Sequence, residues 1–98
     1  MLSNQDYLLV KLAEECTEVG QMVAKVLQFG LDEKQHEDGP SNRERLHAEL
    51  NDLMAAIKML NDEEGFGYHV DREAIDRKIT KVSYYRGYSQ SLGLVEEK

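Results

Sequence analysis

The sequence predicts an all-α protein, a helical bundle whose four-helix core is completed by further copies of the same chain. Two long stretches repeat apolar residues at steps of three and four, which is helical periodicity. Residues typical of helix N-caps precede these stretches and glycines follow them. No stretch shows the alternation expected of a half-buried strand. The 98 residues are expected to form one small domain, 1–98.

The first predicted helix runs from Gln5 to Phe29. Ser3 or Asn4 is placed to cap its start, and Gly30 to end it in the left-handed conformation. We expect its single cysteine to lie in the core, because it falls within the apolar stripe. That stripe comprises Leu8, Leu12, Cys16, Val19, Val23 and Val26.

A second helix is predicted after the polar segment 32–40, which has the composition of a mobile loop. Ser41 and Glu44 have the spacing of a capping box, in which each side chain satisfies a free backbone N–H at the helix start. The helix is expected to run to the turn at 65–67. Its stripe is Leu46, Leu50, Leu53, Ile57 and Leu60.

Asp71 is a good N-cap for a third helix, with Val70 and Ile75 placed as a hydrophobic staple. We expect Ile75, Ile79 and Val82 to be buried and Gly87 to end the helix. The tail 88–98 is expected to add a short turn that docks on a partner subunit.

Charge and composition exclude several classes of protein. The 19 acidic and 12 basic residues give a net charge of −7, which disfavours nucleic acids and anionic membranes as direct partners. No apolar run is long enough for a membrane span, and the N-terminus lacks the features of a secretory signal. We therefore expect a cytoplasmic protein. One cysteine allows no internal disulfide, so a homodimer or homotetramer, or a bound metal, is expected to stabilise so short a chain.

Two acidic motifs carry the functional prediction. Glu14, Glu15 and Glu18 form an EExxE motif on the first helix, and Glu49 and Asp52 form an ExxD motif on the second. Positions three apart project from nearly the same side of a helix. If the two helices pack antiparallel, the second and third acids of EExxE face both acids of ExxD across a groove.

Four converging carboxylates repel one another unless a cation or raised pKa values relieve the repulsion. An all-oxygen site suits Mg²⁺, or Mn²⁺ in its place. Zinc is disfavoured because His36, His47 and His69 have no mutual ligand spacing. The alternative is that the acids form a solvated helix surface. It accounts easily for one motif and less easily for two that border apolar stripes.

The segments LAEECTEVGQMVAKVL and HAELNDLMAAIKML resemble the all-α nucleoside triphosphate pyrophosphohydrolases of the MazG type, whose signature is EExxE followed by ExxD. The resemblance covers about half the chain. It implies that Mg²⁺ is held by Glu15, Glu18, Glu49 and Asp52, and that Glu14 positions a second ion or the attacking water. It also implies that basic residues of the next helix meet the phosphates, here Lys78, Lys81 and Arg86, with Tyr85 among the aromatic residues placed for the base and sugar.

The resemblance implies hydrolysis of a nucleoside or deoxynucleoside triphosphate to the monophosphate and pyrophosphate, as housecleaning of the nucleotide pool. Glu14 or Glu18 is expected to act as general base. Two alternatives stay open. One is phosphoribosyl-ATP pyrophosphohydrolase, from the same superfamily, and the other is a helical interaction module without activity.

Overall fold

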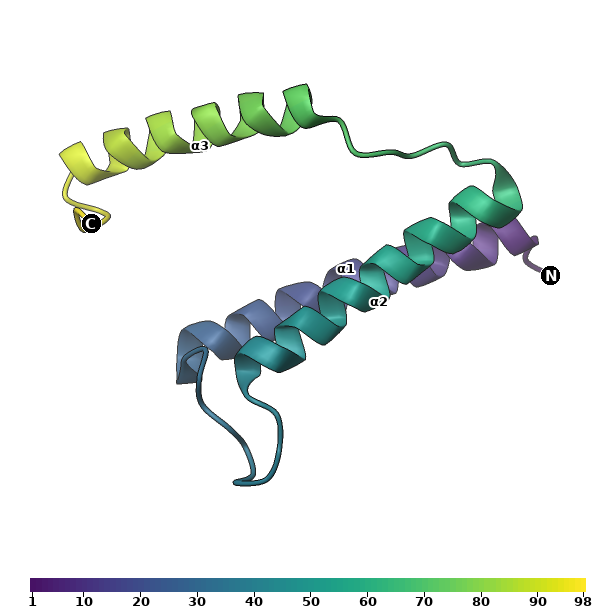
Figure 1. The fold of residues 1–98 in the computed structure, drawn as a ribbon, viewed down its shortest axis with the longest axis horizontal. Coiled ribbons are helices and arrows are strands. Elements are labelled where there is room, and N and C mark those ends of the chain that lie inside the picture. Colours follow the sequence, from purple (N-terminus) through teal and green to yellow (C-terminus); the bar gives the residue numbers. More distant parts are fainter. The chain divides into compact units, whose positions relative to one another are not determined.

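The computed structural model describes all 98 residues as three helices, which confirms the all-α prediction. These are α1 (Asn4–Phe29), α2 (Asn42–Glu64) and α3 (Arg72–Ser91), shown in Figure 1. The chain divides into two compact units. The first, Met1–Tyr68, contains α1 and α2, and the second, His69–Lys98, contains α3. None of the helices has an apolar stretch long enough to cross a bilayer.

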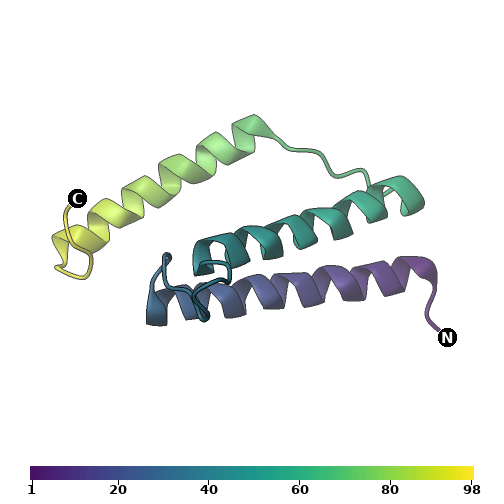
Figure 2. The ribbon, with the colours of Figure 1, turned by 60° about the horizontal axis from the view of Figure 1, so that its bottom comes forward.

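Helices α1 and α2 lie side by side and run in opposite directions, as Figures 1 and 2 show. Residues that are buried or half-buried between them recur at alternating steps of four and three, the spacing of paired helices. We call this set the seam. It consists of Leu8, Leu12, Glu15, Val19, Met22 and Val26 of α1 with Asn42, Leu46, Glu49, Leu53, Ala56 and Leu60 of α2.

The seam differs from the predicted apolar stripes. Cys16 was expected in the core and is exposed, and Val23 and Leu50 are only partly covered. Met22 is buried in place of Val23, and Glu15 lies in the seam in place of Cys16. The prediction was wrong because each helix carries apolar residues on two adjoining faces, and the pattern alone does not say which face meets the neighbouring helix.

Hydrogen bonds join the residues that follow α1 to the first residues of α2. Gly30 ends α1 with φ of 94° and ψ of 156°. Glycine adopts this conformation readily because it has no Cβ, but it is not the left-handed helical conformation that was expected. The backbone N–H of Arg43 donates to the carbonyl of Leu31 at 2.8 Å. The Asn42 backbone N–H donates to the Glu33 carbonyl at 3.0 Å, and its side-chain amide donates to the Gly30 carbonyl at 2.9 Å. These bonds fix where α2 starts relative to the end of α1.

The predicted capping box is confirmed. The Glu44 N–H donates to Ser41 Oγ, and the Ser41 N–H donates to Glu44 Oε1, each at 3.2 Å. At the other end Gly65 is left-handed, as a helix stop requires. The Asn61 side chain then holds the backbone of Tyr68, donating to its carbonyl at 2.8 Å and accepting from its N–H at 2.9 Å.

The second unit begins with the predicted N-cap, in which Asp71 Oδ1 accepts from the Ala74 N–H at 3.0 Å. Helix α3 passes through Gly87 and ends four residues later, so the predicted end was wrong. A glycine inside a helix costs only about 1 kcal/mol, which the surrounding helical residues outweigh. The tail turns back at Gly93, and the Leu94 N–H donates to the Ser89 carbonyl.

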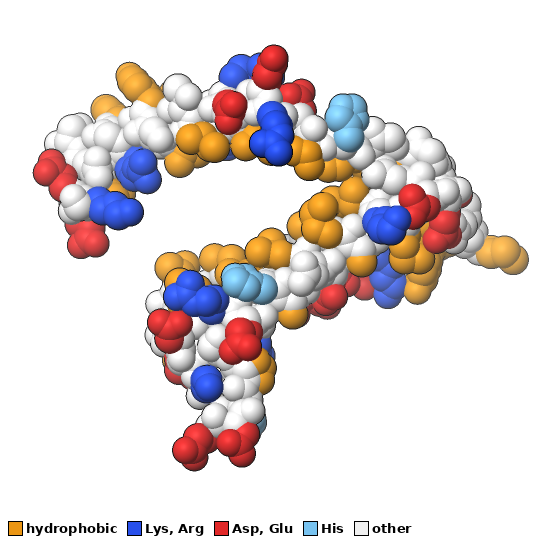
Figure 3. All heavy atoms as spheres, viewed as in Figure 1, with side chains coloured by type: hydrophobic (Ala, Val, Ile, Leu, Met, Phe, Trp, Pro, Cys, Tyr) orange, Lys and Arg blue, Asp and Glu red, His pale blue; other side chains and the backbone are white.

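The expected burial of α3 is not observed within the chain. The helix has no buried residue, and Figure 3 shows hydrophobic side chains along one of its sides. Ile75, Ile79 and Val82 are each about half exposed.

The seam predicts a large difference between two leucines of the first unit. Leu60 is 1% exposed and Leu2 is 58% exposed. Leu60→Ala should lower the free energy of unfolding by about 2–4 kcal/mol, because it leaves a cavity between α1 and α2. Leu2→Ala should change it by less than about 0.5 kcal/mol. Denaturation in urea measures both, and equal effects would contradict the packing described.

Candidate metal centre

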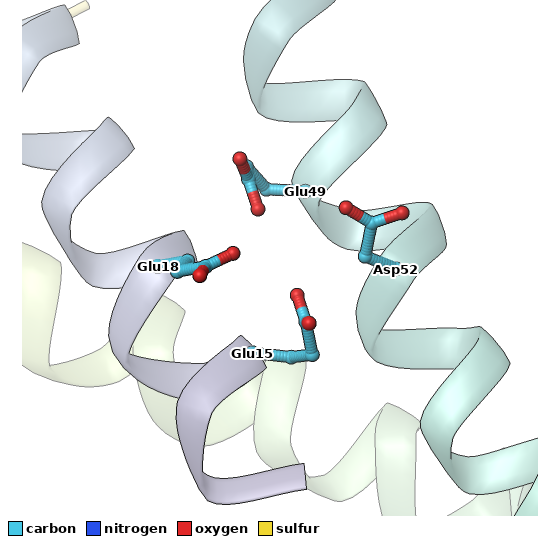
Figure 4. Close-up of side chains that lie close together, drawn as sticks. All are labelled: Glu15, Glu18, Glu49 and Asp52. Atoms are coloured by element: carbon cyan, nitrogen blue, oxygen red, sulfur yellow. The ribbon is translucent and has the colours of Figure 1, made fainter. Parts of the chain in front are cut away.

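The two acidic motifs meet at the middle of the seam. Glu15, Glu18, Glu49 and Asp52 each offer a carboxylate oxygen, and these four oxygens lie within 4.8 Å of one another. Figure 4 shows the four side chains directed into one shared space, two from α1 and two from α2. The juxtaposition predicted from the motif spacing is therefore present in the fold. We call these residues the carboxylate cluster.

Two members of the cluster take seam positions. Glu15 and Glu49 stand where the surrounding seam residues are mostly apolar, whereas Glu18 and Asp52 lie at the exposed edge. Atom Oε2 of Glu15 and atom Oε2 of Glu49 are buried without any hydrogen-bond donor. Burying a carboxylate oxygen without a hydrogen-bond partner raises the free energy of the folded state, and a proton or a bound cation at these two atoms would lower it.

The electrostatics of the cluster follow from this crowding. Loss of solvent raises the pKa of Glu15 above its ordinary value of 4.5, and the nearby carboxylates of Glu18, Asp52 and Glu49 raise it further. Loss of solvent also raises the pKa of Glu49, and the hydrogen-bonding contact with Glu18 acts in the same direction. The negative charges of these groups are therefore mutually unfavourable without a bound cation.

The donor set fits a hard divalent cation. It contains only carboxylate oxygens, with no histidine or cysteine in the cluster. Oxygen ligands are those that Mg²⁺ and Mn²⁺ prefer. A cation among the four groups would give the two buried oxygens the partner that the chain does not supply.

Glu14, the first acid of EExxE, is not part of the cluster. Its Oε2 accepts a hydrogen bond from Lys11 Nζ at 3.2 Å, and both side chains are about half exposed. Glu14 and Glu18 line one shallow depression on the outer side of α1. The fold thus keeps Glu14 beside the cluster and paired with a lysine.

Arg45 is a site residue that the sequence reasoning missed. It lies one turn before Glu49 on α2 and is half-buried, and its positive charge opposes the rise in the pKa of Glu49. The i, i+4 spacing between Arg45 and Glu49 was the available signal. The family pattern points to basic residues that follow the ExxD motif, whereas Arg45 precedes it.

The residues predicted to meet the substrate lie together in the second unit. Lys78, Lys81, Tyr85 and Arg86 line one pocket of about 480 Å³ along α3, together with Val95 of the tail. Helix α3 carries five basic residues and two acidic ones, although the chain as a whole is acidic. A role in binding phosphates stays a prediction for these four residues.

No family model, curated protein or solved structure matches this chain. The resemblance to the MazG type accordingly stays a prediction that rests on the two motifs and their spacing.

The crowded cluster predicts that a charge-removing substitution stabilises the metal-free protein. In EDTA at about pH 7.5, Glu49→Gln should raise the melting temperature by a few degrees, because it removes one of four mutually repelling charges. The folded wild type binds protons at Glu15 and Glu49 more readily than the unfolded chain. Its stability should therefore rise as the pH falls from neutral toward 4.5, by more than that of the variant.

Thermal unfolding followed by circular dichroism measures this effect. Mg²⁺ bound at the cluster would reverse the order, since a ligand of the folded state stabilises it by mass action and the variant has one carboxylate fewer to hold the ion. Glu64→Gln is the matched control, because Glu64 is exposed at the far end of α2 and should respond to neither change. A Glu49→Gln variant that melts below the wild type in EDTA would contradict the repulsion inferred for the cluster.

Proposed function

We propose that this protein is a Mg²⁺-dependent nucleoside triphosphate pyrophosphohydrolase, which converts a nucleoside or deoxynucleoside triphosphate to the monophosphate and pyrophosphate. The observation that carries the proposal is the carboxylate cluster, in which two buried oxygens lack a partner. The order of the EExxE and ExxD motifs agrees with it. Membership of the MazG type is part of the same proposal.

Charge explains why such a site needs a cation. A triphosphate carries about four negative charges, and an acidic chain repels it unless a divalent ion is shared between carboxylate and phosphate oxygens. Glu15, Glu18, Glu49 and Asp52 are the residues that would hold Mg²⁺, with Mn²⁺ as a substitute. When bound, Mg²⁺ would polarise the phosphoryl group, stabilise charge on the leaving pyrophosphate and lower the pKa of a bound water.

Glu18 is the best candidate for the general base. It belongs to the cluster, it is exposed to solvent at its edge, and neither of its oxygens is among the buried atoms that lack a partner. Its carboxylate can accept a proton from a water molecule and return it to solvent. Glu14 is the alternative and must first give up its ion pair with Lys11.

Positive charge for the departing phosphates is available from two sources. Arg45 lies one turn from Glu49 within the same unit. Lys78, Lys81 and Arg86 share a pocket with Tyr85 on α3, where basic side chains and an aromatic ring occur together. Such cations stabilise a transition state only if they meet charge that develops during the reaction.

The proposal is tested by turnover over a panel of canonical and modified nucleoside triphosphates, with and without Mg²⁺, using inorganic pyrophosphatase and detection of phosphate. Activity should require Mg²⁺. Glu49→Gln and Asp52→Asn should each lower kcat/KM by at least about a hundredfold, because each removes a metal ligand. Glu64→Gln, on the same helix and outside the cluster, should leave turnover unchanged.

The outcomes separate the alternatives. Activity confined to phosphoribosyl-ATP would assign the chain to histidine biosynthesis. No turnover, together with no change in melting temperature on adding Mg²⁺, would favour an interaction module whose acids serve solubility. A cluster variant with full turnover would contradict the metal-binding assignment.

We also propose that the protein is a homodimer or homotetramer. Besides the seam, α1 has a second apolar stripe that adjoins it and is exposed, made of Leu9, Cys16, Val23 and Leu27. Leu50 and Met54 of α2 are similarly exposed. Packing two hairpins through such faces would form a four-helix core.

Light scattering should therefore give about two or four times the chain mass of 11.2 kDa. Val23→Asp should shift the protein toward the monomer, because it places a charge in the exposed stripe. Gln28→Asp adds the same charge at an exposed position that is already polar, and it should not. A wild-type mass of one chain would contradict this proposal.

A further inference from the structure

Two pockets of different character flank the carboxylate cluster along the hairpin. The first, which we call the tyrosine pocket, has a volume of about 330 Å³ and is lined by Tyr7, Leu8, Glu15, Asp52, Ala56 and Met59, among others. The second, which we call the arginine pocket, has a volume of about 190 Å³. It is lined by Lys25, Phe29, Glu33, Gln35, Asn42 and Arg45. The cluster lies between them because Glu15 and Glu18 fall between Tyr7 and Lys25 on α1.

The tyrosine pocket has the features of a nucleoside site. Glu15 and Asp52 line it, so it opens directly onto the cluster. Most of its remaining lining is apolar, and alanines on α2 leave room beside the Tyr7 ring, which is 50% exposed. A base is a flat aromatic group that stacks on such a ring. The volume lies within the usual range for small-molecule sites.

The tyrosine pocket is poorly suited to phosphates. Its only cation is Lys11, whose Nζ lies 5.3 Å from the centre of the Tyr7 ring and forms an ion pair with Glu14 at 3.2 Å. The arginine pocket instead has two cations, Lys25 and Arg45, and one carboxylate, that of Glu33. Arg45 precedes Glu49 by four residues, which is about 6 Å along a helix. Positive charge therefore lies next to the cluster on the side opposite Tyr7.

We propose that the substrate lies along the seam with a fixed polarity, its base and sugar in the tyrosine pocket against Tyr7 and its terminal phosphates toward Arg45 and Lys25. The inference rests on the proposed function and deepens it, since it assigns a nucleoside site and a phosphate site within the first unit. Tyr7 then determines preference for nucleotides over other triphosphates. Arg45 binds any triphosphate, whatever group it carries.

The experiment compares a nucleoside triphosphate as substrate with inorganic tripolyphosphate, which has no base or sugar, as competitive inhibitor, both with Mg²⁺. Tyr7→Ala should raise KM for the nucleotide about tenfold with little change in kcat, because stacking is lost. The inhibition constant of tripolyphosphate should stay unchanged. Tyr7→Phe, which keeps the ring, should resemble the wild type.

Two further variants complete the design. Arg45→Ala should raise both KM for the nucleotide and the inhibition constant of tripolyphosphate, each about tenfold, because it removes a phosphate ligand. Tyr68→Ala is the matched control: Tyr68 is 47% exposed in the same unit and lines neither pocket, so both constants should stay at wild-type values. Circular dichroism verifies that each variant is folded.

The results distinguish failure of this inference from failure of the proposed function. A wild type that hydrolyses no nucleotide would overturn both. An active wild type whose Tyr7→Ala variant keeps its KM would overturn the polarity alone. If Phe29→Ala, in the arginine pocket, raises KM while Tyr7→Ala does not, the nucleoside lies in the opposite direction. If Tyr7→Ala raises KM for the nucleotide and the inhibition constant of tripolyphosphate equally, Tyr7 does not act on the base. That result would also overturn the proposed polarity.

Discussion

The unpaired carboxylates of Glu15 and Glu49 are the constraint on which the rest of this molecule depends. Both occupy seam positions between α1 and α2, where an apolar side chain would pack better, and each has an oxygen that receives no hydrogen bond. Such groups lower the stability of the isolated chain. A bound divalent cation would offset this effect, so the feature that weakens the metal-free hairpin is also the one that supports the proposed Mg²⁺ site.

The closure of the hairpin determines whether the acids meet. Asn42 is almost fully buried, and together with Arg43 it ties the start of α2 to the residues that follow α1. A shift of one residue in this connection would turn Glu49 away from Glu18, because neighbouring helical positions differ by about 100°. The capping box at Ser41 reinforces the same starting point. The loop thus controls the site without contributing a ligand to it.

The two ends of the seam differ in the charged side chains that line their pockets. The carboxylate cluster separates a largely apolar pocket at Tyr7 from a pocket that contains Arg45 and Lys25. A nucleotide has the same asymmetry, with an aromatic base at one end and charged phosphates at the other. Complementarity of this kind fixes the orientation of a ligand more than it raises affinity. The half-exposed faces of α1, α2 and α3 leave ample apolar surface for association between chains.

By itself the sequence determined the helices, the N-caps of α2 and α3, and the pairing of Glu15 with Glu18 and of Glu49 with Asp52. Periodicity, capping by Ser41 and Asp71, and i, i+3 spacing all act within one helix. The sequence did not determine which face of α1 is buried, so the prediction that Cys16 lies in the core was wrong. The prediction that α3 ends at Gly87 was also wrong, because a helix can continue through glycine. Only the tertiary structure placed Glu15 in the seam and left one oxygen of Glu15 and one of Glu49 without partners. These features depend on the register between two helices, which arises from contacts between residues far apart in the chain.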